Sequence, residues 1–414
     1  MTDLPANAPV DLQDERLRTV NNRGFSISGM IDGIRSGDLG LLPVVAGLLI
    51  ICVVFQSLNH IFLSSTNLVN LLMECVPVGV ISLGIVCVLL VGQIDLSVGS
   101  VSGLSSAITA VVFVQHRQPL ALAILAAVAT GASIGWLYAQ VFNRFGVPSF
   151  VITLAGLLAV LGTQLKTLGK AGSINVPFNS SLVRFAQLQF VPKPLAYVFV
   201  LAAAAGLLLS GILHRNDRLK AGLSVRGVST LVVRSVSLAV GLGVAVFYLN
   251  KTRGVGWMFM LLIVLVLAVN YMLTRTKWGK SVFAVGGNVE AARRAGINTK
   301  RIYTSVFMLC SSLAAVGGVL AAARLAASNQ SSGAGDVNLN AIAAAVIGGT
   351  SLFGGRGTAF SALVGIIVIQ SISNGLTLLN LDSAYRFAVT GLVLLLAVTL
   401  DSVARRSRAS HGRA

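Results

Sequence analysis

This chain has few carboxyl groups, and those that lie within apolar stretches are the first candidates for chemistry. Asp95 interrupts one apolar region, in the passage G-Q-I-D-L-S-V-G-S, and Glu74 stands alone in another. A carboxyl group in or near hydrocarbon is costly and is usually retained for a function. Asp95 with Ser97 could cap the next helix, contact a polar substrate, or serve in packing or gating. Glu74 could relay protons, although we expect it to pair inside a helical bundle.

The other reactive residue types form no catalytic pattern. The histidines His60, His116, His214 and His411 are scattered, and no motif of the form G-x-x-x-x-G-K-[ST] is present. The four cysteines lie in or beside apolar runs without paired spacing, so we expect small buried hydrophobic side chains. The sequence therefore predicts that the chain is not an enzyme, hydrolyses no ATP itself and binds no metal or cofactor of its own.

A glycine-rich passage follows Asn340, reading A-I-A-A-A-V-I-G-G-T-S-L-F-G-G-R-G-T-A-F over 341–360. The pairs Gly348–Gly349 and Gly354–Gly355 interrupt a continuous apolar stretch. Glycine at this density in a span is typical of an unwound or tightly packed segment. A simple hairpin between two spans outside the membrane is the alternative. The polar segment 327–338 could meet a delivery protein or could be an ordinary solvated loop.

The basic segment 275–301 contains the most informative residues, E-A-A-R-R-A-G-I-N from Glu290 to Asn298. Helix-forming residues run from Glu290 to Arg294, and Gly296 stands where a helix would stop. The small side chains of Ala291 and Ala292 would let a partner groove approach closely, and Glu290 offers a charge to a partner arginine. An ordinary basic loop with an alanine-rich turn is the alternative.

The elements that hold these residues are predicted to be membrane-spanning helices. Of the 414 residues, 55% are hydrophobic and only 11% are charged, against about 25% charged in soluble domains. A spanning helix needs about 20 mostly apolar residues, and uncharged runs of that length recur without the alternation of barrel strands. We therefore predict an all-α polytopic bundle of about 10–12 helices. The expected spans are 40–58, 68–91, 98–115, 120–142, 149–168, 195–213, 231–249, 255–273, 303–323, 340–353, 358–379 and 385–401.

The net charge of +18 reflects topology rather than binding of nucleic acid. Its lysines and arginines gather in the segments 214–234 and 275–301 and in the tail after residue 401. Positive charge marks cytoplasmic loops, so these regions and the N-terminus are predicted to be cytoplasmic. The organisation is a cytoplasmic arm (1–38, with no cleaved targeting sequence), a transmembrane domain (39–401) and a basic tail (402–414).

Four passages, taken together and in order, resemble the permease subunits of bacterial ABC importers for monosaccharides. This group carries ribose, xylose, arabinose and galactose. The matching passages are G-Q-I-D-L-S-V-G-S at 92–100, G-V-P-S-F-V-I-T-L at 146–154, G-N-V-E-A-A-R-R-A-G-I-N at 287–298 and A-I-A-A-A-V-I-G-G-T-S-L-F-G-G-R-G-T at 341–358. The third passage and the apolar pair around 195–249 are most similar to xylose permeases.

The resemblance implies a homodimer in the bacterial inner membrane, surrounded by lipid. An ATP-binding cassette subunit, which holds ATP and magnesium, would dock inside, and a periplasmic sugar-binding protein would dock outside. The implied coupling residues are Glu290, Ala291, Ala292, Gly296, Ile297 and Asn298. The implied pathway or gating residues are Gln93, Asp95, Ser97, Gly99, Ser100, Asn340, Gly348, Gly349, Gly354 and Gly355.

Two other functions fit parts of the sequence. An ABC permease for another small polar cargo would carry the same coupling loop. An ion-coupled secondary transporter would use Glu74 and Asp95 as relays and would not need that loop. Family members often have acidic residues just before A-I-A-A, where this chain has Asn338 and Asn340, and this departure weakens any transfer of substrate identity.

Overall fold

The computed structural model describes residues 42–225 and 227–382, together with positions 384, 385, 388, 389, 391, 392, 395 and 399. The arm 1–38, the tail 402–414 and most of the expected span 385–401 lie outside the described residues. The contacts divide the chain into two compact units. One is a hairpin over 191–255, and the other is a main bundle over 40–190 and 256–403.

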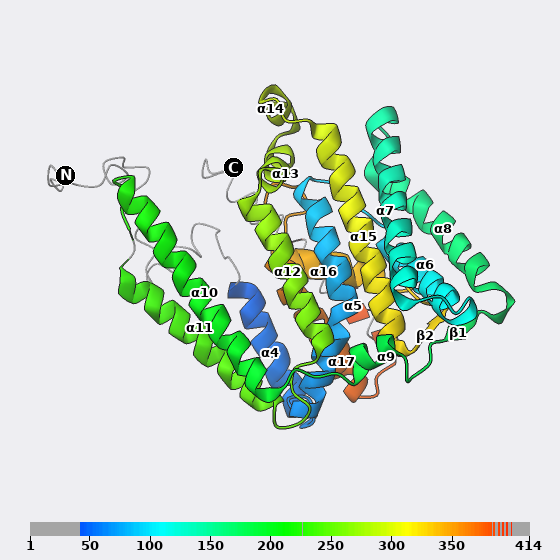
Figure 1. Ribbon diagram of the computed structural model, residues 1–414, viewed down its shortest axis with the longest axis horizontal. Helices are drawn as coiled ribbons and strands as arrows, with labels where there is room; N and C mark the ends of the chain where they lie inside the picture. The colour runs from blue at the N-terminus through cyan, green and yellow to red at the C-terminus, as the bar shows by residue number, and fades with distance from the viewer. Residues whose placement is uncertain are drawn as a thin grey trace. The chain divides into compact units, whose positions relative to one another are not determined.

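Helices dominate both units, and the described strands are two of three residues each (Figure 1). The main bundle contains α4 (Leu42–Leu58), α5 (Ser65–Leu90), α6 (Val98–Ala110) with the π-helical turn Val111–Gln115, α7 (Leu120–Phe145), α8 (Ser149–Leu168) with the 3₁₀ turn Gly169–Ala171, β1 (Ser173–Asn175), α9 (Ser181–Gln187), α12 (Trp257–Arg275), α13 (Lys277–Gly287), α14 (Val289–Arg294), α15 (Thr299–Leu325), β2 (Ala327–Asn329), α16 (Val337–Ile347) and α17 (Ala359–Leu378).

Nine of the described helices are long and apolar enough to cross a membrane, which confirms the predicted all-α polytopic class. The spans expected in these regions fall on helices, usually with boundaries shifted by a few residues. The nine are α5, α6 with its π-helical turn, α7, α8, α10, α11, α12, α15 and α17.

The span predicted over 340–353 is wrong. Helix α16 ends at Ile347, and its 11 residues cover only about 16 Å, roughly half of a bilayer core. The chain continues through a non-helical glycine-rich segment to the start of α17 at Ala359. Because the N–H of Gly355 donates to the carbonyl of Leu90 at 2.9 Å, this segment reaches the end of α5. Helix and loop together therefore replace the predicted spanning helix.

The centre of the main bundle is formed by α5 and α15. The apolar window of α5 is 78% buried and that of α7 only 22%, so α5 is interior and α7 turns most of its surface outward. Helix α15 packs against α5 on one side and α7 on the other (Figure 1). On α7, Gly131 and Gly135 form a G-x-x-x-G pair, the spacing that lets membrane helices approach closely. A Cβ at Gly135 would lie 2.3 Å from the carbonyl oxygen of Phe307 on α15.

The hairpin unit consists of α10 (Lys193–Lys220) and α11 (Val228–Leu249). The two helices pack against each other, and the Ser235 hydroxyl donates to the carbonyl of Ala204. At the turn, the Arg218 guanidinium donates to the carbonyl of Ser224 at 2.9 Å. The additional apolar pair predicted around 195–249 is therefore present as two long helices.

Candidate functional site

The basic segment 275–301 folds into two short helices at one end of the main bundle, beside the start of α15 (Figure 1). The side chain of Asn288 caps α14 by accepting from the N–H of Ala291 at 2.9 Å. After α14, Gly296 has φ +79°, a left-handed conformation that glycine adopts without strain. The predicted helix start near Glu290 and the stop at Gly296 are confirmed, whereas α13 was not predicted.

One face of α14 is fixed to the bundle and the other is exposed. Ala292 is buried, and Ile297 packs against the main hydrophobic core. Glu290 is more than half exposed and forms ion pairs with Arg293 at 3.5 Å and Arg294 at 3.7 Å within the same helix. Exposed pairs of this kind contribute about 0–1 kcal/mol, so a partner can exchange them at little cost.

A junction of three glycine-containing segments lies directly before α14. Gly286 of α13 faces the end of α5 and the loop after α16. A Cβ at Gly286 would lie 1.7 Å from the carbonyl oxygen of Leu90 and 2.7 Å from the backbone nitrogen of Gly355. A Cβ at Gly354 would likewise lie 3.0 Å from the backbone nitrogen of Gly92. The glycine-rich loop, the end of α5 and the helix that leads into α14 are therefore in backbone contact.

Asp95 is completely buried in the loop between α5 and α6. Its Oδ1 accepts from the backbone N–H of Ser97 at 2.8 Å and from the Ser97 hydroxyl at 2.7 Å. Its Oδ2 has no hydrogen-bond partner among the described residues. Burial raises the pKa of the Asp95 carboxyl, and the hydrogen bonds from Ser97 oppose that shift. The carboxylate organises its own loop and has no surface through which a substrate could reach it in this conformation.

The cap of α6 comes from elsewhere in the chain. Neither Asp95 nor Ser97 caps α6 through its side chain; instead, the N–H of Gly99 donates to the side-chain oxygen of Asn338 at the start of α16. Ser100 is also buried, whereas Gln93 is partly exposed. Asn338 therefore has a structural contact with α6, which its position in the sequence does not indicate.

The segment 327–338 is anchored rather than freely solvated. β2 pairs antiparallel with β1, and the buried amide of Gln164 donates to the carbonyl oxygens of Asn329 at 3.2 Å and Ser332 at 2.9 Å. Exposed positions remain at 330, 331, 334 and 335. Asn340 donates to Asp336 at 2.8 Å, so these two side chains face each other.

Glu74 pairs inside the bundle, as predicted. Its carboxylate forms an ion pair of 2.7 Å with Arg324 of α15 and accepts from the Gln370 amide of α17 at 3.0 Å. The Glu74 and Arg324 side chains are 28% and 25% exposed. They therefore hold the main bundle together while part of each side chain remains accessible.

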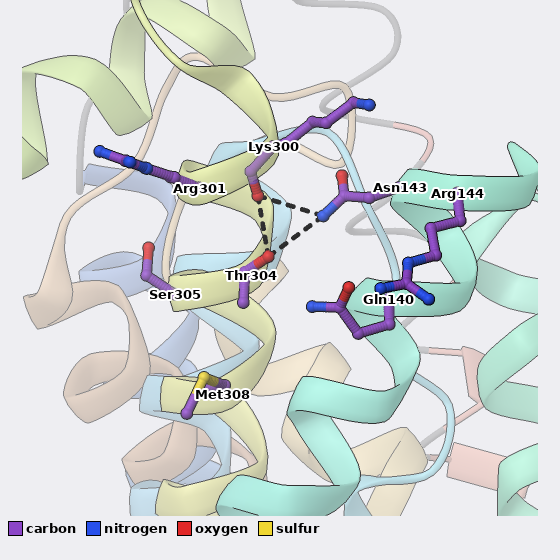
Figure 2. A pocket seen from close by; sticks show the side chains of 8 residues that line it. All are labelled: Gln140, Asn143, Arg144, Lys300, Arg301, Thr304, Ser305 and Met308. Carbon is purple, nitrogen blue, oxygen red and sulfur yellow. Dashed lines mark hydrogen bonds between the residues drawn. The ribbon is translucent and has the colours of Figure 1, made fainter.

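A basic cleft of about 390 Å³ lies between the ends of α7 and α15 (Figure 2). Asn143 bridges the two helices by donating to the carbonyl of Lys300 and to the hydroxyl of Thr304, both at 3.1 Å. The charged lining residues are Arg144, Lys300 and Arg301, with no carboxylate among them. Because Lys300 follows the E-A-A-R-R-A-G-I-N segment almost directly, this end of the main bundle presents concentrated positive charge.

Taken together, the geometry is that of a multi-pass membrane protein, with an exposed helix at the basic end of its main bundle and polar groups held between its spans. The described residues contain no group of three or more His, Cys, Asp or Glu side chains that could hold a metal ion. Of the described cysteines, Cys75, Cys87 and Cys310 are buried, and all four are free.

Residues 67–398 match the family described as the branched-chain amino acid transport system permease component, and the chain belongs to this family. It is thus a permease subunit of the bacterial inner membrane and not an enzyme. It is 34% identical to the xylose transport system permease protein XylH of Escherichia coli (strain K12), over 92% of this chain and 96% of that protein.

Two further relatives agree with the resemblance to sugar-importer permeases. XylH of Haemophilus influenzae (strain ATCC 51907 / DSM 11121 / KW20 / Rd) is 32% identical over 89% of this chain and 98% of that protein. The ribose import permease protein RbsC of Escherichia coli (strain K12) is 29% identical over 86% and 91%. No solved structure matches the chain.

Proposed function

We propose that this chain is the permease subunit of an ATP-driven importer that moves a monosaccharide, with xylose as the first candidate, across the inner membrane. The observation that carries the proposal is the 34% identity to a xylose permease over nearly the full length of both chains. The exposed α14, placed between α13 and α15 at the basic end of the main bundle, supports an ATP-driven system.

Coupling would pass through α14. An ATP-binding cassette subunit, carrying ATP and magnesium, would bind the exposed side of α14 while Ala292 and Ile297 hold the other side to the bundle. Movement of α14 would then reach Gly286, and through it the end of α5 and the glycine-rich loop that contains Gly354 and Gly355. ATP and a loaded binding protein would select one state of the permease by their differential affinity for it.

The remaining partners follow from the same class of system. A periplasmic sugar-binding protein would dock at the end opposite α14, where the exposed positions of 330–335 lie beside the β1–β2 pair. A second copy of the chain would complete the pathway, and lipid would cover the apolar outer faces of helices such as α7 and α8. The pathway would not be lined by the buried residues Asp95, Ser97, Gly99 and Ser100. These residues would instead support the segments that line it.

The test is purification of the full chain from its native membrane in mild detergent, with mass spectrometry of the proteins that accompany it. We expect an ATP-binding cassette subunit, which should be lost in Glu290→Arg. The control is Lys170→Glu, a charge reversal of the same size and opposite sign. Lys170 is exposed and follows α8, at the end of that helix far from the basic end of the main bundle. Recovery of the chain alone, with uptake driven by an ion gradient, would instead favour a secondary transporter using Glu74 and Asp95.

Uptake competition identifies the cargo. Cells that express the complete system should accumulate labelled xylose, and unlabelled xylose should compete better than ribose or allose. Competition by a nucleoside or an amino acid and not by any sugar would replace the monosaccharide with another small polar cargo, while leaving the ATP-driven class intact.

A further inference from the structure

Three polar side chains from distant parts of the sequence meet between α5, α15 and α17. The ion pair of Glu74 with Arg324 and the hydrogen bond from Gln370 to Glu74 join residues 250 and 296 positions apart. Glu74 lies nine residues after the start of α5 at Ser65, and α5 ends at the junction next to the basic loop. The cluster therefore lies toward the outer end of the span, about 13 Å from its start.

The exposed part of this cluster cannot face lipid at acceptable cost. Charged side chains within membrane spans face the bundle interior, a water-filled cavity or another protein. The Glu74 and Arg324 side chains are 28% and 25% exposed, while most of α5 around them is buried. Their accessible side must therefore meet an aqueous passage, the water at the outer membrane surface or another polypeptide segment.

The cluster also keeps hydrogen-bonding capacity in reserve. A guanidinium carries five N–H donors. Arg324 directs Nη2 toward Glu74, and its Nε is buried, so the donors left for a ligand are the remaining N–H groups on Nη1 and Nη2. A guanidinium, a carboxylate and an amide together both donate and accept, as the hydroxyl groups of a sugar require. Few and adaptable contacts also suit a site from which the ligand must leave again.

Neighbouring polar residues on the same helices are already occupied. Asn67 and Asn374 donate to each other at 2.8 and 3.2 Å and are buried. They lie on the faces of α5 and α17 that carry Glu74 and Gln370, one or two turns away. Because their amide groups are already paired, these two asparagines serve to link α5 to α17. The cluster at Glu74 is therefore the accessible polar group between these two helices.

We propose that Glu74, Arg324 and Gln370 form a contact site for the hydroxyl groups of the transported sugar, on the outer half of the translocation pathway. The proposal rests on the proposed function and adds to it a substrate contact at residues outside the recurring motifs. A second copy of the chain packed over the cluster is the alternative occupant, and the two experiments below distinguish the possibilities.

The first experiment asks whether water reaches the cluster, and it requires no sugar. Gln370→Cys is introduced with Cys52→Ser, since the other three cysteines are buried, and intact cells are treated with a membrane-impermeant methanethiosulfonate. We expect labelling, because a thiol in water ionises and reacts. Leu158→Cys, 67% exposed on the apolar face of α8, should stay unlabelled in lipid. Absence of labelling at position 370 would overturn the proposal and indicate a covered interface.

The second experiment measures transport by the complete system. Gln370→Leu should lower xylose uptake at limiting sugar by about threefold to tenfold, the range for one hydrogen bond, with stimulation of ATPase activity by the loaded binding protein unchanged. The charge swap Glu74→Arg with Arg324→Glu keeps an ion pair at this place, so the variant should still assemble, but it should not take up sugar. Full uptake in the swap, or unchanged uptake in Gln370→Leu, would overturn the site. Absence of sugar uptake in the wild type would refute the proposed function itself.

Discussion

The glycine junction before α14 allows a sharp test by a pair of neighbouring substitutions. Gly286 and Gly287 are the last two residues of α13. A Cβ at Gly286 would lie 1.7 Å from the carbonyl oxygen of Leu90, whereas a Cβ at Gly287 would meet nothing within 4 Å. The variants Gly286→Ala and Gly287→Ala add the same methyl group to the same helix turn, so they differ mainly in what that group meets.

The magnitude follows from the contacts at Gly286. To bring the new carbon to 3.0 Å from the Leu90 oxygen, the backbones must separate by about 1.3 Å. Overpacking of this kind typically costs about 1–3 kcal/mol. The same movement disturbs the hydrogen bond from Gly355 to Leu90, which contributes about 0.5–1.5 kcal/mol. The helix-propensity gain from glycine to alanine is at most about 1 kcal/mol and is similar at both positions.

We therefore expect Gly286→Ala to be less stable than Gly287→Ala by about 2–4 kcal/mol. The assay is unfolding of the purified full chain in mixed micelles as the fraction of denaturing detergent increases, with the melting temperature as a second readout. If the two variants unfold within about 0.5 kcal/mol of each other, the ordinary range for surface substitutions, the junction is not tightly packed and the reasoning fails.

Two further predictions concern buried polar groups. Burial raises the pKa of the Asp95 carboxyl above its ordinary value of 3.8, so the folded protein favours the protonated carboxyl. The contribution of Asp95 to stability is therefore complete below pH 3.8 and is lost as the pH rises through the raised pKa. Wild type should therefore gain melting temperature relative to Asp95→Asn as pH falls from 8 to 4, and a constant difference would contradict this. A double-mutant cycle of Asn67→Leu and Asn374→Leu should give a coupling of about 0.6–1.7 kcal/mol, measured by detergent unfolding. Additive effects would exclude the reciprocal hydrogen bonds.

The parts of the fold predicted well are those that depend on local composition. Uncharged runs of about 20 residues have few alternatives to a spanning helix, because backbone polar groups in hydrocarbon must be satisfied within the segment. The short α14 was predictable for a similar reason, since helix formers from Glu290 are followed by Gly296 at a left-handed position. Local residue types were sufficient in both cases.

The parts predicted poorly depend on contacts between distant segments. Helix α16 stops at Ile347, and the loop after it packs its backbone against Leu90 and Gly286. Hydropathy along one segment cannot predict such a contact with a distant segment. The cap of α6 by Asn338 joins residues 239 positions apart. The β1–β2 pair likewise joins 173–175 to 327–329, and neither strand is long enough to show an alternating pattern.

Burial separates the polar residues that attract attention in the sequence from those that can meet a ligand. Asp95 and Ser97 are completely buried and hydrogen-bond to each other, so their side chains hold the loop between α5 and α6. Glu74 and Arg324 belong to no recognisable motif, yet each keeps part of its charged side chain accessible. A transported molecule must pass through accessible space and leave it again. The substrate-contacting residues are therefore best sought among partly exposed polar groups within the spans. The buried motif residues are better explained as structural support for the segments that carry those groups.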